Sequence, residues 1–388
     1  MHGKQEVQNL FSHMIPRAAT AGLAIVFVLE LILVFTQSAQ AQTFQVIHTF
    51  TGGLNGKNPD STLTVDQAGN IYGTTDNGGD GRGCGGYGGC GTVFKLQPTD
   101  SGWALEIIHD FNAGDGYFGR GGESADSQVV IGPGGGLYGT TAAGGPAGGC
   151  NGLTCGTLFN LKAASSSGQW TDHILYLFGG STGEGPAYEP LTFDQYGNVY
   201  GTCGGGPNGN GIVFKLAPSE PEWTESILYS FTGSATSPSG GVIFDPAGNL
   251  YGATRFGPGG TCPDGCGTVF QLTPSESGWT ENTLYSFQGG SDGTYALAGV
   301  ISDPSGNLYG ATSGQCGSCN GSVFMLAPSG GDWTFSSLHS FATGEGPAER
   351  RSRGSSPARR ARDNGRSAFH RARSTDRCAS PSLRGFPR

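Results

Sequence analysis

One phrase recurs along the chain and limits what it can fold into. Gly-Asn-Leu-Tyr-Gly-Ala-Thr occupies residues 248–254. Close variants of it stand at 69–75, 136–141, 197–203 and 306–312, so that successive tyrosines are 51 to 66 residues apart. A recurrence of this length predicts an array of similar supersecondary units. The chain is therefore expected to hold five copies of one structural unit.

Composition narrows the type of unit. The 388 residues include 72 glycines, and only 13% of the residues are charged. Glycine inside a helix or strand costs roughly 0.5–1 kcal/mol relative to alanine, so it should concentrate in turns and loops. An all-β protein with short strands and glycine-rich loops is expected.

Each unit reads as four short strands in a fixed order. In the first unit, strand a covers 62–66, strand b covers 70–75 and strand c covers 91–96. Strand d begins at Trp103 and ends at Phe111. An Asp-x-x-Gly-Asn turn joins strands a and b, and turns of this composition close antiparallel hairpins. The unit is therefore predicted to be a four-stranded antiparallel meander.

Aromatic side chains repeat at fixed positions and are the predicted repeat core. Strand b carries a tyrosine, strand c a phenylalanine, and a tryptophan opens strand d. The residues are Tyr72, Tyr138, Tyr200, Tyr251, Tyr309, Phe94, Phe159, Phe214, Phe270, Phe324, Trp103, Trp170, Trp223, Trp279 and Trp333. Because strand c is apolar on both faces, the sheets must pack face to face. A β-propeller-like array of five blades is expected, with an incomplete six-bladed ring or an open β-solenoid as alternatives.

The repeat also resembles a known family. Its tyrosine phrase, the following glycine-rich loop, Gly-Thr-Val-Phe-Lys-Leu, a tryptophan and Leu-Tyr-Ser-Phe together resemble the GloVer tandem repeat of bacterial extracellular proteins described as choice-of-anchor. The resemblance covers roughly residues 44–345. It implies secretion and surface display, and it brings no enzymatic activity with it.

The N-terminus has the layout of a signal peptide. Lys4 and Arg17 precede an apolar run at 21–35, and a small-residue cleavage pattern ends at Ala41. The alternative is an uncleaved membrane anchor, but the run is short for a bilayer span and contains Glu30. Cleavage after Ala41 and export are predicted, which leaves no transmembrane segment in the mature protein.

Charge separates the repeats from a C-terminal tail. Residues 42–348 hold 25 acidic and seven basic side chains, whereas residues 349–388 hold twelve arginines, no lysine and three acids. An acidic surface repels phosphate backbones, so nucleic acid is excluded as a partner of the repeats. The tail is interpreted as a disordered arm or a frameshifted end. The predicted division is 1–41 signal peptide, 42–346 repeats with an N-terminal orphan strand, and 347–388 tail.

Eight of the ten cysteines form close pairs between strands b and c. These pairs are Cys84 with Cys90, Cys150 with Cys155, Cys262 with Cys266, and Cys316 with Cys319. Each loop offers two thiols and no nearby histidine, whereas structural zinc needs four ligands, so disulfides are predicted and no metal site is. Cys203 and Cys378 have no such neighbour. Cys203 replaces a strand-b threonine, which predicts a buried, unreactive thiol.

Two recurring polar sets are interpreted as structural. His48, His109 and His339 stand where other units carry Tyr176, Tyr229 and Tyr285, so an aromatic packing role is favoured over metal binding or base catalysis. The turn acids could bind Ca²⁺, but each stands alone in its turn, which favours turn capping. These acids are Asp66, Asp194, Asp245 and Asp303.

No catalytic motif is found in the sequence. It has no nucleophile elbow, zinc-protease helix or phosphate-binding loop, and the acidic pair Glu184/Glu189 is weak evidence for glycoside hydrolysis. The predicted function is an exported, non-catalytic binding or adhesion module for an unknown extracellular glycan or protein, without a cofactor. A secreted hydrolase of glycans or esters is the alternative.

Residues 43–50 match the end of a strand d that lacks its own strands a, b and c. Such an orphan strand would need partners from the other end of the array. We expect this strand either to have few of its backbone hydrogen bonds satisfied or to be added to the edge of the fifth blade. An unpaired sheet edge favours aggregation.

Overall fold

The computed structural model describes residues 44–59, 61–80, 89–112, 128–141, 155–164, 169–179, 190–219, 222–314 and 321–341. Met1–Ile47 and His48–Arg388 are separate compact units, and the sheets belong to the second. The predicted signal peptide and the arginine-rich tail lie outside the described residues. Within those residues, no helix has the length and apolar character to cross a membrane.

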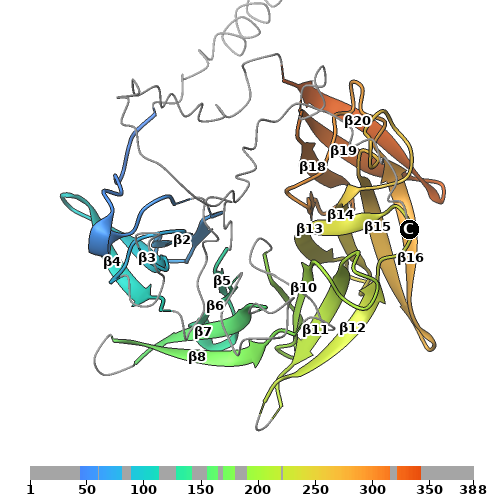
Figure 1. The fold of residues 1–388 in the computed structure, drawn as a ribbon. Helices are drawn as coiled ribbons and strands as arrows, with labels where there is room; N and C mark the ends of the chain where they lie inside the picture. The colour runs from blue at the N-terminus through green and yellow to red at the C-terminus, as the bar shows by residue number, and fades with distance from the viewer. Residues whose placement is uncertain are drawn as a thin grey trace, which may run out of the picture. The chain divides into compact units, whose positions relative to one another are not determined.

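Each repeat unit forms one antiparallel sheet with its four strands in chain order, as Figure 1 shows. The sheets are β1 (Thr64–Val65), β2 (Ile71–Thr75), β3 (Thr92–Thr99) and β4 (Gly102–Asp110); β5 (Val130–Ile131), β6 (Leu137–Thr140), β7 (Thr157–Ala163) and β8 (Trp170–Leu177); β9 (Thr192–Phe193), β10 (Val199–Cys203), β11 (Ile212–Ala217) and β12 (Thr224–Ser230); β13 (Thr236–Phe244), β14 (Leu250–Phe256), β15 (Thr268–Ser275) and β16 (Gly278–Ser286); β17 (Val300–Ser302), β18 (Leu308–Thr312), β19 (Ser322–Ser329) and β20 (Asp332–Ser340). Two short 3-10 turns, Gly53–Asn55 and Pro133–Gly135, complete the described elements. The prediction of an all-β, propeller-like array of five four-stranded sheets is confirmed.

The Asp-x-x-Gly-Asn turn is held together by its own carboxylate. Asp245 Oδ1 accepts hydrogen bonds from the backbone N–H groups of Ala247 and Asn249, both at 2.9 Å. Its Oδ2 accepts from Asn249 Nδ2 at 2.7 Å and from the Tyr251 hydroxyl at 3.0 Å. Gly248 has φ of 87°, a conformation that glycine adopts without strain. The same bonds recur around Asp66, Asp194 and Asp303.

The glycine after each strand-b tyrosine makes room for an aromatic ring. A Cβ at Gly252 would lie 2.5 Å from Cζ of Phe270, the residue paired with it on β15. The corresponding approach is between 2.4 and 2.7 Å at Gly73, Gly139, Gly201 and Gly310. The Tyr-Gly pair therefore recurs because the strand-c phenylalanine lies over the backbone of strand b.

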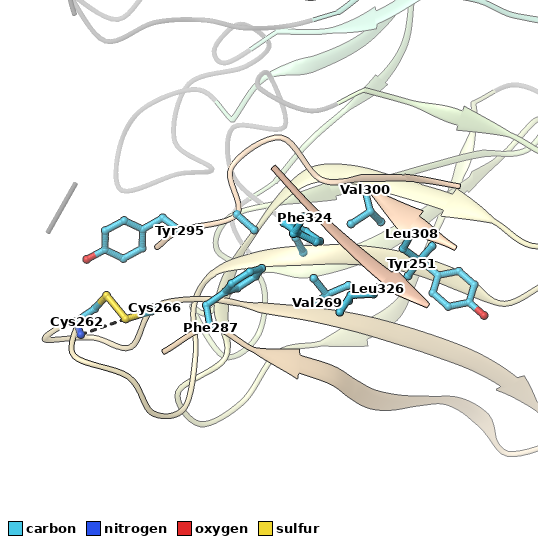
Figure 2. Packing of buried hydrophobic residues seen from close by; sticks show 12 residues of the cluster. Tyr251, Cys262, Cys266, Val269, Phe287, Tyr295, Val300, Leu308, Phe324 and Leu326 are labelled. Atoms are coloured by element: carbon cyan, nitrogen blue, oxygen red, sulfur yellow. Dashed lines mark hydrogen bonds between the residues drawn. A yellow bond between two sulfur atoms is a disulfide. The ribbon is translucent and has the colours of Figure 1, made fainter. Parts of the chain in front are cut away.

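Neighbouring sheets pack through aromatic contacts. The phenylalanine that follows strand d of one sheet lies edge-on against the strand-c phenylalanine of the next. These contacts are Phe111–Phe159, Phe178–Phe214, Phe231–Phe270 and Phe287–Phe324, with ring centroids 5.1 to 5.3 Å apart. Figure 2 shows Phe287 and Phe324 among the buried residues of the last of these junctions.

The strand-b tyrosines add a second contact at each junction. Tyr72 and Tyr251 lie against Trp170 and Trp333 of the following sheet. Tyr138 and Tyr200 lie instead against strand-a phenylalanines, Phe193 and Phe244. All five predicted strand-c phenylalanines are buried, as are the tyrosines except half-buried Tyr309, and all five tryptophans are half-buried.

Two segments differ from the expected strands. Strand β13 begins at Thr236, earlier than the repeat predicts, because positive φ at Gly240 and Gly241 allows a bulge after which pairing with β14 continues. Residues 44–50 form no strand. The Phe50 ring lies 4.7 Å from that of Phe94, against the first sheet rather than along the edge of the fifth.

Candidate active site

Asp110 departs from the repeat. It is the last residue of β4 and precedes Phe111. The other units have Leu177, Ser230, Ser286 or Ser340 in this place. A carboxyl group thus stands where the repeat requires none.

Backbone from the loop after β2 lies directly beside Asp110. A Cβ at Gly79 would lie 3.0 Å from Asp110 Oδ1, and the Thr92 methyl group is on the same side. The Gly79 N–H donates to the Gly53 carbonyl at 2.9 Å, which holds this loop to the 3-10 turn before the sheet. Asp110 Oδ1 therefore lies against the backbone of the preceding loop at Gly79.

The electrostatics of Asp110 are unlike those of the turn acids. Its Oδ1 is buried and has no hydrogen-bond partner among the described residues. Burial raises the pKa of Asp110, and the negative charge of Asp80 raises it further, while His109 acts in the opposite direction. The side chain is thus an acid that holds its proton to higher pH than an ordinary aspartate.

Asp80 and Asp110 form an asymmetric pair of carboxyl groups. Asp80 is exposed to water, whereas Asp110 is partly buried. Two carboxyl groups in such different environments can divide the roles of proton donor and charged base or nucleophile.

Sequence reasoning missed both members of this pair. The sequence did hold one sign of this site: Asp110 stands at a repeat position where the other units have serine or leucine. The acidic pair that was considered, Glu184 and Glu189, lies outside the described residues.

The turn acids are occupied by their own hairpins. At Asp303, the hydrogen bond from the Asn307 side chain is the main cause of a lowered pKa. At Asp245, burial works against the lowering, but bonds from Asn249 and Tyr251 outweigh it. Burial and the Asp245 bond raise the pKa of Tyr251 to about 12. These carboxylates act as turn caps in the structure.

The repeat histidines pack as the tyrosines do. His48, His109 and His339 each meet the phenylalanine two residues later edge-on, with ring centroids 4.6 to 4.7 Å apart. The equivalent tyrosines make the same contact at 5.1 to 5.2 Å. Histidine and tyrosine are therefore interchangeable at this aromatic position.

One predicted loop disulfide is present in the described residues. Cys262 and Cys266 are bonded, with Cα atoms 5.2 Å apart, and the Cys262 N–H donates to Cys266 Sγ (Figure 2). Cys90 and Cys155 are also disulfide-bonded. The pairing of these two with Cys84 and Cys150 stays a prediction, as does the last pair, because Cys84, Cys150, Cys316 and Cys319 lie outside the described residues.

The Cys262–Cys266 loop also lines a cavity of about 610 Å³. Gly233, Ser234 and Thr236 form another part of its wall, and Asp264 is its charged residue. This cavity has one carboxyl group rather than a pair.

Cys203 is a buried thiol at the end of β10. In the fourth sheet, a hydroxyl pair occupies this place, with Thr254 Oγ1 and Thr268 Oγ1 2.7 Å apart. Cys203 faces Ile212 instead. Both members of the pair are thus replaced by less polar residues.

Comparison with known proteins places the sequence in a repeat family. It matches the Gloeobacter/Verrucomicrobia repeat over residues 33–237 and again over 203–353. The chain belongs to this family. The predicted resemblance is thereby confirmed, and family membership together with the disulfide fits an exported protein. The sequence matches no curated protein.

Several solved structures similar to this repeat protein are enzymes. A putative 6-phosphogluconolactonase from Bacteroides uniformis is 13% identical, with TM-score 0.45, over 74% of this chain and 71% of its own. An endo-arabinase from Bacteroides thetaiotaomicron is 15% identical, with TM-score 0.35, over 75% and 98%. A xylan β-1,4-xylosidase from Bacillus halodurans is 13% identical, with TM-score 0.37, over 76% and 55%.

These neighbours correct one expectation. The prediction of a non-catalytic module is contradicted, because the similar structures are chiefly glycoside hydrolases and a lactonase. At such low identity the likeness concerns architecture alone. Any activity of this chain has to be argued from its own side chains.

Proposed function

We propose that this protein is an exported glycoside hydrolase that uses Asp110 and Asp80 as its carboxyl pair. The observation that carries the proposal is the buried Asp110 Oδ1 beside Gly79, which has no hydrogen-bond partner among the described residues. Burial, and then the charge of Asp80, raise the pKa of this carboxyl group. Glycoside hydrolysis commonly uses one carboxyl group that keeps its proton and one that is ionised. Asp110 is assigned as the general acid and Asp80 as the base or nucleophile.

Export is part of the proposal. The N-terminal layout supports a signal peptide cleaved after Ala41. The disulfide between Cys262 and Cys266 supports an oxidising compartment. The substrate would then be an extracellular glycan.

The test is hydrolysis of a panel of nitrophenyl glycosides, with nitrophenyl esters as a second arm. Asp110→Asn and Asp80→Asn should each lower kcat/KM by about 100-fold or more, the usual contribution of an acid or base. Asp100→Asn is the matched control, because Asp100 is an exposed aspartate in the turn between β3 and β4, at the other end of β4 from Asp110. It should leave kcat/KM unchanged.

The pH profile assigns the roles. Asp80→Asn removes a charge that raises the pKa of Asp110, so the alkaline limb of any residual activity should move to lower pH. No turnover of any substrate, or full turnover by Asp110→Asn, would overturn the proposal. Hydrolysis of the esters alone would overturn the assignment to glycosides.

A further inference from the structure

The four junctions between sheets repeat one interface. On one side lie a strand-b tyrosine, the first apolar residue of strand c and the phenylalanine after strand d. On the other side lie the first apolar residue of strand a and the strand-c phenylalanine of the next sheet. The two sides differ, so the interface is heterologous and can propagate in one direction.

The last sheet presents the first side of this interface without a cover. Tyr309, Val323 and Phe341 are each partly exposed. Their counterparts in the four preceding sheets are buried against the following sheet. No further sheet lies over this face among the described residues.

The first sheet presents the second side. Leu63, the first apolar residue of strand a, is 49% exposed. The residues equivalent to Leu63 in the other sheets are buried, namely Val129, Leu191, Val242 and Val300. The two ends thus expose complementary halves of a junction that the chain already makes four times.

The phenylalanine position of the first sheet is filled by a weakly held segment. Phe50 lies against Phe94 as Phe111 lies against Phe159. Residues 48–50 belong to no strand, and no backbone hydrogen bond joins them to another described segment. By contrast, the Phe341 N–H donates to the Gly321 carbonyl at 2.9 Å within its own sheet.

We infer that two copies of this protein associate end to end, with the last sheet of one copy stacked on the first sheet of another. Phe341 of one copy then replaces Phe50 beside Phe94 of the second. The N-terminal segment competes with this contact. A second copy is the expected partner because its first sheet carries the same surface that covers each of the first four sheets within one chain.

Sedimentation equilibrium of the purified protein over a range of concentrations tests the inference through opposite effects of two similar substitutions. Phe341→Ala should raise the dissociation constant at least tenfold, because a buried aromatic contact is lost. Phe50→Ala should lower it by about tenfold, because the competitor is removed. Tyr196→Ala is the control, since Tyr196 is an exposed aromatic residue on a turn of the third sheet, and it should change nothing.

The double variant Phe50→Ala/Phe341→Ala distinguishes the specific interface from non-specific aggregation. It should return to weak association, whereas non-specific aggregation through an uncovered Phe94 would leave it as associated as Phe50→Ala. Circular dichroism checks that each variant keeps its sheets. A single-copy mass for Phe50→Ala at every concentration would overturn the inference, as would strong association of the double variant.

Discussion

Two aspartates near the end of strand d in different sheets have opposite surroundings. Asp292, after β16, is buried and accepts hydrogen bonds from the Tyr285 hydroxyl at 3.1 Å and the Gln288 and Gly290 N–H groups at 2.7 and 3.0 Å. Asp110, at the end of β4, has a buried oxygen without a partner among the described residues. The first is a structural carboxylate because its bonds are made. The second is the carboxyl group that we propose as the general acid.

The comparison shows how one framework serves two purposes. Burial and the charge of Asp292 raise the pKa of Tyr285 to about 12, so this hydroxyl stays a hydrogen-bond donor at ordinary pH. At Asp110 the nearby charge is that of another acid, Asp80, and the carboxyl itself holds its proton more tightly. The Asp292 carboxylate is thus held by hydrogen bonds, whereas Asp110 has a raised pKa and a buried oxygen without a partner among the described residues.

The largest expected effect is the loss of Asp292. Asp292→Ala leaves a half-buried tyrosine hydroxyl and two backbone N–H groups without their acceptor, and should lower the free energy of unfolding by about 2 kcal/mol. Asp110→Ala is the matched comparison and should lower it by less than about 1 kcal/mol, because Asp110 Oδ1 has no hydrogen bond to lose among the described residues. Urea unfolding measures both. Equal losses would remove the distinction between the two aspartates.

The disulfide beside Asp292 should contribute next. Its sulfur atoms pack against backbone at Gly260 and Gly289, so it ties the loop after β14 to the connection that holds Asp292. Replacing Cys262 and Cys266 by serine should lower the free energy of unfolding by about 2 kcal/mol, as expected for a short closed loop. Reduction of this bond in the wild type should lower the free energy of unfolding by the same amount. The double variant lacks the bond, so a reducing agent should cause no such loss in it. An unchanged midpoint in the double variant would show that the loop is held by other contacts.

The smallest expected effect concerns pH. The pKa of Asp245 is lowered on folding, so its stabilisation is present above 3.8 and is lost as the pH falls through the folded value. The pKa of Asp110 is raised, so its stabilisation is present below 3.8 and is lost as the pH rises through the folded value. Asp245→Asn should therefore cost about 1 kcal/mol at neutral pH and less in acid. The cost of Asp110→Asn should instead be larger in acid than at neutral pH in the same unfolding series. If the free energies of unfolding of both variants depend on pH as that of the wild type does, both assignments are contradicted.

Much of the fold could be predicted from the sequence because it rests on repeated local chemistry. Asp245, Gly248 and Tyr251 form one hydrogen-bonded turn that is recognisable from spacing alone. The early start of β13 was missed because its bulge depends on pairing with β14. The position of Phe50 was missed because it depends on packing against Phe94, a residue far from it in sequence.

The candidate site could not be predicted in the same way. A single polar residue at the end of a strand, such as Asp110, reads as an ordinary turn residue. Its importance depends on burial beside Gly79 and on the charge of Asp80, which only the folded arrangement supplies. Comparison between repeat units was the one available signal.

The pKa of Asp110 itself gives the most direct test of the proposed carboxyl pair. Carbon-detected NMR can follow the side-chain carboxyl resonances of ¹³C-labelled protein, with Asp110→Asn used to assign the signal. Asp110 should titrate above the ordinary aspartate value of 3.8, and Asp80→Asn should bring its midpoint down. A midpoint at or below 3.8, or one that does not move when Asp80 is replaced, would contradict the account.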